Sequence, residues 1–438
     1  MTGDFAVLKD RSVLALFAAR STSLLGNAIA PIALAFTVLH LPGGSPTMLG
    51  VVLAARLLSQ VTFVLLGGAI ADRLPKLRVM VGADLAAGLT QGLAAVLVVT
   101  GHATPWMLAG FAALAGAATA LFEPASRSAM PLLVSGDDLQ SANSLLKLSM
   151  RGGGILGAAL GGVLVSTIGA GNTMLVPAAT FVLSALLLLG VKVAHQPPPS
   201  GAPTLIRQIR EGWQEFTAKQ WVWVMVTQLA YVNVLLAGSF YVLGPVMADR
   251  SLGGAGAWSV VLIAQALGFI VGSVVAIKFR PRRPVRAAAL LTMGFPLSVL
   301  LMAAEAPLAA IAVATFLAGI VIDVYEVLLD TSLQKNVPPH ALSRVMSYES
   351  LGSFALVPLG MAAAGPVADA VGVQTALYGA AALIVLAGPA VLLLRSVRTV
   401  TDAPASETGH KTASETGHEA ETGHETGTEA PATEKSTA

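Results

Sequence analysis

Long apolar runs, separated by short polar connections, fill most of the chain. A helix rises about 1.5 Å per residue, so roughly 20 apolar residues cross the ~30 Å hydrocarbon core of a membrane. Twelve runs reach or approach this length: residues 13–39, 48–71, 79–100, 105–122, 139–168, 173–193, 221–247, 257–277, 285–302, 307–328, 345–368 and 375–394. Most are apolar around their whole circumference, as buried or lipid-facing helices are. The pattern predicts an all-α membrane protein with twelve transmembrane helices.

Basic residues are distributed unevenly between the connections. If both termini are cytoplasmic, the inner connections hold most of the lysines and arginines, and the outer connections hold only Arg250. Because positive charge accumulates on the cytoplasmic side, we expect a multi-pass protein of the cell membrane with both termini inside. The net charge of +2 gives no reason to expect a nucleic acid partner, and the absence of cysteine excludes disulfides and thiolate metal ligands.

The chain divides into two halves of six spans each. A proline-rich stretch at 196–203 separates them, and residues 204–220 have the spacing of an amphipathic helix lying on the inner membrane face. Five pairs of identical residues recur at an offset of 203, which indicates a duplicated unit: Glu123/Glu326, Val134/Val337, Leu139/Leu342, Ser144/Ser347 and Gly157/Gly360.

The predicted organisation has five segments. They are a cytoplasmic N-terminus (1–12), a six-helix bundle (13–193), a cytoplasmic linker (194–220), a second six-helix bundle (221–398) and a disordered tail (399–438). The tail repeats Glu-Thr-Gly-His, a polar composition that cannot bury enough apolar surface to fold alone. Its three histidines suggest at most a weak metal site, so we expect no functional metal.

The connection between spans two and three carries a specific motif. It reads Gly-Ala-Ile-Ala-Asp-Arg-Leu-Pro-Lys-Leu-Arg from position 68 to 78. This resembles the G-x-x-x-D-[RK]-x-G-x-[RK]-[RK] signature of the major facilitator superfamily, with Pro75 in place of the second glycine. The resemblance implies two pseudo-symmetric six-helix bundles around a central polar cavity. It also implies a cytoplasmic gate in which an acid at the end of span four, here Glu123, pairs with a basic residue of the motif. The expected gate and motif residues are Gly68, Asp72, Arg73, Lys76, Arg78, Glu123, Arg127 and Arg344.

Span five contains closely spaced glycines. Gly153, Gly157, Gly161 and Gly162 resemble the superfamily's antiporter motif, with Ala158 in place of its proline. Small residues at this spacing make a smooth face for tight helix packing. Together with segments of spans one, four and ten, the chain is similar over about residues 10–398 to the drug-efflux branch that includes macrolide exporters. The arginine that many proton antiporters keep within span four is absent here.

Ionisable residues inside spans are costly and are therefore functional candidates. Polar stripes on spans one and two make Arg20, Asn27, Arg56 and Gln60 candidates for the substrate cavity.

Three acids on span ten are candidates for proton coupling. Asp323, Glu326 and Asp330 recur on one helical face. They repel one another, and burial disfavours their charged forms, which suits uptake and release of a proton. A purely structural role for each, as a partner of nearby arginines, stays open. Asp84 and Glu349 are expected near cytoplasmic helix ends.

Other chemistries find no support in the sequence. It contains no Gly-Lys dipeptide and so no phosphate-binding loop or ATPase domain, and it has neither a His-Glu-x-x-His nor a Gly-x-Ser-x-Gly motif. We therefore expect no enzyme and no cofactor.

The favoured function is export of a small amphipathic compound by proton antiport, with the two bundles rocking around a central site. The expected partners are the substrate, protons and the lipid bilayer, and the expected state is a monomer. One alternative is uptake or facilitated transport of a small organic anion or siderophore, which Arg20 and Arg56 would suit. Another is a non-transporting membrane scaffold or sensor.

Overall fold

A computed structural model describes residues 10–73, 75–129, 133–134, 139–191 and 213–400. In this part of the chain every regular element is a helix, as expected. The helices of the first half are α1 (Arg11–His40), α2 (Pro46–Arg73), α3 (Lys76–Val99), α4 (Pro105–Ala129), α5 (Leu139–Ile168), α6 (Ala170–Thr173) and α7 (Leu175–Leu189).

The second half repeats the pattern with more breaks. Its elements are α9 (Gln220–Leu236), η3 (Ala237–Val242), α10 (Leu243–Met247), η4 (Ala248–Leu252), α11 (Ala255–Lys278), α12 (Pro284–Leu291), η5 (Thr292–Gly294), α13 (Leu297–Ala303), α14 (Leu308–Asn336), α15 (Pro339–Phe354), α16 (Val357–Val371), α17 (Val373–Val391) and α18 (Arg395–Thr399).

Eleven helical stretches of the described chain are long and apolar enough to cross a membrane. The remaining predicted span is α5, a helix of 30 residues whose shorter apolar part is Gly152–Ile168. The all-helical fold class is therefore confirmed. The exact limits of the five predicted segments stay predictions, and the tail and residues 194–212 lie outside the described residues.

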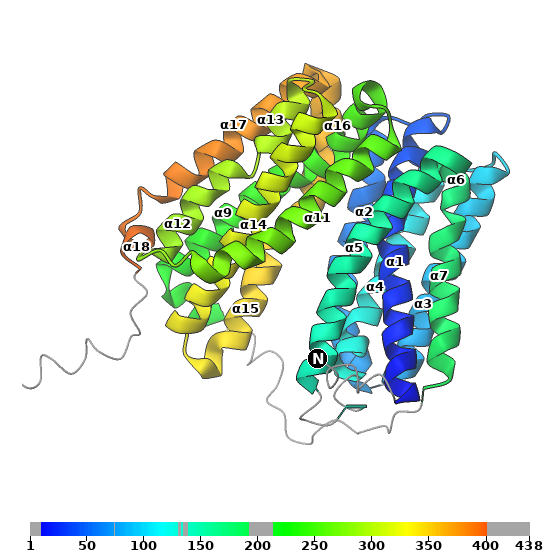
Figure 1. Ribbon diagram of the computed structural model, residues 1–438, viewed down its shortest axis with the longest axis horizontal. Coiled ribbons are helices and arrows are strands. Elements are labelled where there is room, and N and C mark those ends of the chain that lie inside the picture. Colours follow the sequence, from blue (N-terminus) through cyan, green and yellow to red (C-terminus); the bar gives the residue numbers. More distant parts are fainter. Residues whose placement is uncertain (1–9, 74, 130–132, 135–138, 192–212, 401–438) are drawn as a thin grey trace, which may run out of the picture.

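The two halves form separate bundles that lean together at one end (Figure 1). Their main contacts are between α2 and α16 and between α5 and α11. Both contacts are close because glycines allow backbones to approach. A Cβ on Gly365 of α16 would collide with the Thr47 backbone of α2, and one on Gly162 of α5 would collide with the Ser259 side chain of α11.

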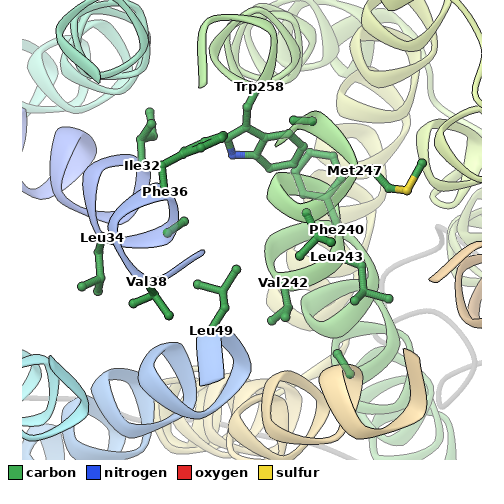
Figure 2. Packing of buried hydrophobic residues seen from close by; sticks show 14 of the residues in the cluster. Ile32, Leu34, Phe36, Val38, Leu49, Phe240, Val242, Leu243, Met247 and Trp258 are labelled. Atoms are coloured by element: carbon green, nitrogen blue, oxygen red, sulfur yellow. The ribbon is translucent and has the colours of Figure 1, made fainter. Parts of the chain in front are cut away.

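The apolar cores show at which end the halves meet. One cluster of buried side chains is shared by both halves, and Figure 2 shows side chains of α1 and α2 facing those of η3, α10 and α11. It includes Phe36, Val38 and Leu49 from the first half and Leu243 and Trp258 from the second. The three further clusters each belong to a single half, and the larger of the two in the first half uses the beginnings of α1 and α3. The halves are thus joined at the end where α1 terminates.

Two polar contacts cross between the halves at the same end. His40, the last residue of α1, lies with Nε2 3.2 Å from Asp249 Oδ1 in η4. Thr47 Oγ1 of α2 donates a hydrogen bond of 2.6 Å to Asp369 Oδ2 of α16. His40 and Asp369 are both exposed, so these contacts lie nearer the surface than the buried apolar cluster.

The seventh span is not one continuous α-helix, although a single helix was expected over residues 221–247. It changes to π-helical turns at Ala237–Val242 and again at Ala248–Leu252. Pro245 in the intervening α10 has no N–H to donate to the preceding turn, which favours such a local widening. Phe240 and Tyr241 both lie in the first of these turns, with ring centroids 5.1 Å apart.

The described end of the linker is helical at residues 213–218 and packs against the second half. Trp213 and Phe216 both contact the ring of Tyr348 on α15, with centroids 5.6 and 5.7 Å away. Phe216 is buried while Trp213 is half exposed. This amphipathic distribution agrees with the predicted helix in its described part.

Candidate functional site

The first half encloses a polar cavity of about 310 Å³ between α1, α2, α3, α4 and α7. The four residues proposed for a substrate cavity all line it: Arg20, Asn27, Arg56 and Gln60. The sequence placed them on two stripes of two helices, and the structure brings the two stripes together. The cavity lies within one bundle, however, rather than between the two.

Arg20 is held by an ion pair at the edge of this cavity. Its Nη2 lies 2.9 Å from Glu123 Oε1, and its Nη1 donates a hydrogen bond of 2.7 Å to Ser126 Oγ. The Arg20 side chain is almost fully buried, whereas a third of the Glu123 side chain is exposed. A residue expected in the substrate cavity and one expected in the gate therefore form a single pair on α1 and α4.

Arg56 and Asn27 connect α2 to α1. Arg56 Nη2 donates to Asn27 Oδ1 at 3.2 Å, and Asn27 Nδ2 donates to the backbone oxygen of Ser23 at 3.1 Å. Close approach of α4 supports this arrangement, because a Cβ on Gly116 would collide with the Arg56 backbone. Both arginines of the cavity are therefore engaged by side chains of their own bundle.

Asp84 also lines this cavity, from α3, and it is 2% exposed. The sequence led us to expect it near a cytoplasmic helix end, but not among the cavity residues. Ser23 Oγ of α1 donates to Asp84 Oδ1 at 3.1 Å. Its position inside the predicted span 79–100 was the available signal, since ionisable residues inside spans are functional candidates. In the structure it lies eight residues after the start of α3, roughly 12 Å along the helix.

A second cavity of about 490 Å³ lies mainly in the second half and reaches Leu57 of α2. Three carboxylates line it, from Glu326 and Asp330 of α14 and Glu349 of α15. Its walls are rich in aromatic rings, contributed by Phe240, Tyr241, Phe269, Phe295, Tyr325 and Phe354. Among the lining residues there is no lysine, arginine or histidine. The cavity therefore combines acidic and aromatic groups at the boundary between the bundles.

Asp323 does not line this cavity, although it was expected to act with Glu326 and Asp330. It is 3% exposed, and Ser273 Oγ of α11 donates to its Oδ2 at 2.7 Å. α11 covers this side of α14 at close range, because a Cβ on Gly272 would come within 2.7 Å of Asp323 Cβ. Only two of the three acids share the cavity.

The glycines of span five have two different neighbours. Gly157 and Gly161 face α1, where added Cβ atoms would collide with Ala28 and approach Ile32 Cδ1 to 2.9 Å. Gly162 faces Ser259 in the other half, and Gly153 has looser surroundings. The expected tight packing is present, while the antiport role implied by the resemblance stays a prediction.

The remaining gate residues are only partly described. Gly68, Asp72 and Arg73 belong to the last turns of α2, where side chains lie outside the described residues, as does the side chain of Arg127. Lys76 and Arg78 begin α3, and Arg344 lies on α15. The expected pairing of Glu123 with a basic residue of the motif is therefore untested, and the partner of Glu123 that the structure does describe is Arg20.

Comparison with known proteins identifies the family. The profile of the transmembrane secretion effector family, MFS_3, matches residues 2–423. The multidrug efflux pump Tap of Mycolicibacterium fortuitum is 27% identical over 402 residues, which cover 88% of this chain and 96% of that protein. Tap of Mycobacterium tuberculosis is 26% identical over 407 residues, covering 87% and 93%.

Solved structures show the same fold at low sequence identity. The nucleoside transporter NupG superposes with a TM-score of 0.71 at 14% identity, covering 87% of this chain and 98% of its own. A bacterial homologue of the lysosomal transporter Spinster, solved in an inward-facing and unoccupied conformation, gives 0.68 at 15% identity, covering 88% and 96%. With the family profile spanning nearly all of the chain, this protein belongs to the transmembrane secretion effector family of major facilitator transporters.

Proposed function

We propose that this transporter exports small amphipathic compounds from the cell in exchange for protons. The relatives named as multidrug efflux pumps support efflux as the direction. The observation that carries the proposal is the acidic and aromatic cavity at the boundary between the two bundles.

The lining of this cavity suits a lipophilic cation. Aromatic faces attract cations and cover apolar surface, and a carboxylate in a site shielded from water favours a positive ligand strongly. Glu326, Asp330 and Glu349 supply the charge, while Phe240 and Tyr241 supply rings from the π-helical turn. Within the proposed amphipathic class, the substrate is therefore a cation with an apolar body.

The packing of the halves supports alternating access. Among the described residues, the bundles share an apolar cluster at the end where α1 terminates, and toward the other end each has its own cluster. With both termini in the cytoplasm, this arrangement is closed to the outside and open to the inside. Export then requires the bundles to rock until the seal lies at the cytoplasmic end.

The same carboxylates provide a direct form of proton coupling. A cation and a proton compete for Glu326 and Asp330, so protons entering from outside displace the drug, and the drug entering from inside displaces protons. Asp323 lies one turn before Glu326 on the same helix, where Ser273 holds it. We propose it as a supporting acid outside the drug-binding surface.

The alternatives fit this geometry less well. An organic anion would need the arginines, but Arg20 and Arg56 line the other cavity and are engaged by Glu123 and Asn27. A scaffold acting through residues 399–438 predicts that removal of this tail abolishes function, whereas the transporter proposed here keeps its activity without it.

The test is transport of a fluorescent lipophilic cation, ethidium, by purified protein in liposomes with an imposed pH gradient. We expect accumulation on the acidic side, and we expect Glu326→Gln and Asp330→Asn to reduce it at least tenfold. Glu305→Gln is the matched control, since this exposed acid at the start of the α13–α14 connection lies away from both cavities. Accumulation independent of the gradient would contradict antiport, and unchanged transport by both cavity variants would contradict the assignment of the site.

A further inference from the structure

Asp84 is a buried acid that the proposed exchange at Glu326 and Asp330 does not use. It lies in the other bundle, on α3, and lines the cavity that contains Arg20 and Arg56. Ser23 on α1 and Ser184 on α7 flank its carboxylate, and each of these three side chains is at most 3% exposed. Three helices of one bundle therefore converge on a single carboxyl group.

The hydrogen bonds around Asp84 are incomplete. Its Oδ1 accepts a hydrogen bond from Ser23, but within the described residues neither its buried Oδ2 nor the buried Ser184 Oγ has a partner. An ionised carboxylate has about four acceptor sites, and a buried charge without further donors or a counter-ion is strongly disfavoured. Among the described residues, Asp84 forms no ion pair.

A proton removes the buried charge without loss of hydrogen bonds. In the ionised form the Ser184 hydroxyl can donate to Oδ2, and in the protonated form the Oδ2 hydroxyl can donate to Ser184 Oγ, while Ser23 donates to Oδ1 in both. The carboxyl group is neutral in the protonated form, so the cost of burying a charge disappears.

The charges that face Asp84 do not replace this proton. Arg20 of α1 is paired with Glu123 of α4, and Arg56 of α2 is bonded to Asn27. Arg20, Arg56 and Glu123 line the same cavity as Asp84, whereas α7 contributes no ionisable side chain. Protonation of Asp84 therefore changes the charge of the cavity by one unit.

We propose that Asp84 is a second proton-binding site, located in the first bundle and separate from the drug. Its carboxylate takes up one proton from water. The resulting hydroxyl group donates a hydrogen bond to Ser184, and the proton returns to water after the bundles have rocked. The link to the rest of the molecule is α1, which carries Ser23 and, thirteen residues further, the Phe36 of the shared apolar cluster. The contribution of Asp84 to export rests on the proposed antiport, whereas proton binding by Asp84 does not depend on it.

Proton binding is measured first, without any drug. Infrared difference spectra of the full-length protein are recorded during a pH titration, and the C=O band of a protonated carboxyl group is followed. We expect Asp84→Asn to remove a band that Asp323→Asn, the same substitution in the other bundle, leaves in place. Retention of every carboxyl band in Asp84→Asn, or loss of the band only in Asp323→Asn, overturns the proposal.

Transport then tests coupling in the same liposomes. Asp84→Asn is expected to bind ethidium within about threefold of wild type, because the two cavities are separate, and to lose at least tenfold of its gradient-driven transport. If gradient-driven transport stays within twofold of wild type, the coupling role is wrong. If wild type shows the carboxyl band but no proton-driven transport, the proposed antiport fails while the proton site stands.

A second variant covers the case in which Asp84→Asn does not fold. Ser23→Ala removes one donor, and donors stabilise a carboxylate more than a neutral acid. The carboxyl band should therefore persist to higher pH, by about half a unit to one unit. No shift of this band in a folded Ser23→Ala protein also overturns the proposal.

Discussion

Glu123 and Glu326, which lie 203 positions apart in the two halves, have different surroundings. Glu123 Oε1 lies 2.9 Å from Arg20 Nη2 and links α4 to α1, whereas Glu326 lines the acidic and aromatic cavity that lies mainly in the second half. The first carboxylate is therefore held in an ion pair within its bundle, and the second faces a cavity.

This difference predicts different effects of the same substitution. Glu123→Gln should lower the melting temperature of the purified protein by several degrees, equivalent to about 1–3 kcal/mol, since a buried guanidinium loses its charged partner. Glu326→Gln should change it much less, because that carboxylate is exposed to the cavity. Tryptophan fluorescence during heating in detergent measures both, and equal losses would contradict the distinction.

Span five gives a prediction with a control in the same helix. Gly157→Ala adds a methyl group that collides with Ala28 of α1, and overpacking of this kind costs about 1–3 kcal/mol. Gly154→Ala adds the same group where no atom lies within 4 Å. We expect a lower yield of folded protein and a lower melting temperature for the first variant only. Equal melting temperatures of the two variants would mean that α5 and α1 can move apart here at little cost.

The contact between Thr47 and Asp369 should bias the balance between the two states of the transporter. Asp369→Ala removes a hydrogen bond that crosses the halves at the closed end. Such an exposed bond contributes about 0.5–1 kcal/mol, which changes the populations about two- to fivefold toward the opposite state. Spin-label distances between α3 and α15 measure this, using cysteine pairs introduced into a chain that has none. Glu305→Ala is the control and should leave the distances unchanged.

His40 makes a second polar contact between the halves at the same end. Its Nδ1 lies 2.7 Å from the Phe36 oxygen and its Nε2 3.2 Å from Asp249 Oδ1, so both ring nitrogens face acceptors.

Because the His40 side chain is largely exposed, removal of this contact should have a small effect. We expect His40→Ala to change the populations of the two states by less than about threefold, measured with the same spin-label distances. A larger change would mean that this contact contributes more to the join between the halves than an exposed pair does.

The sequence predicted the fold well because its signals are local. Length and apolarity define spans, and the duplicated Glu123 and Glu326 indicate two halves. The site was harder, since the spacing of Asp323, Glu326 and Asp330 shows that they share a helical face but not what covers that face. Close approach of α11 at Gly272 removes Asp323 from the cavity, and such an approach depends on the rotation and packing of two helices.

Helix packing that the sequence does not predict also brings Asp84 into a cavity, whereas it removes Asp323 from one. Ser23 and Ser184, the neighbours of Asp84, are 61 and 100 positions away in the chain, and no local pattern connects them. The linker gives a similar case, because the helical spacing predicted an amphipathic segment but could not identify Tyr348 as the ring it contacts.

The two crossings between the bundles have a mechanical consequence. At one, Gly365 meets the backbone of Thr47, and at the other, Gly162 meets the short side chain of Ser259. At each of these glycines an added Cβ would meet either backbone or a serine side chain. A larger residue at either position would therefore push the two bundles apart at the end where they are joined.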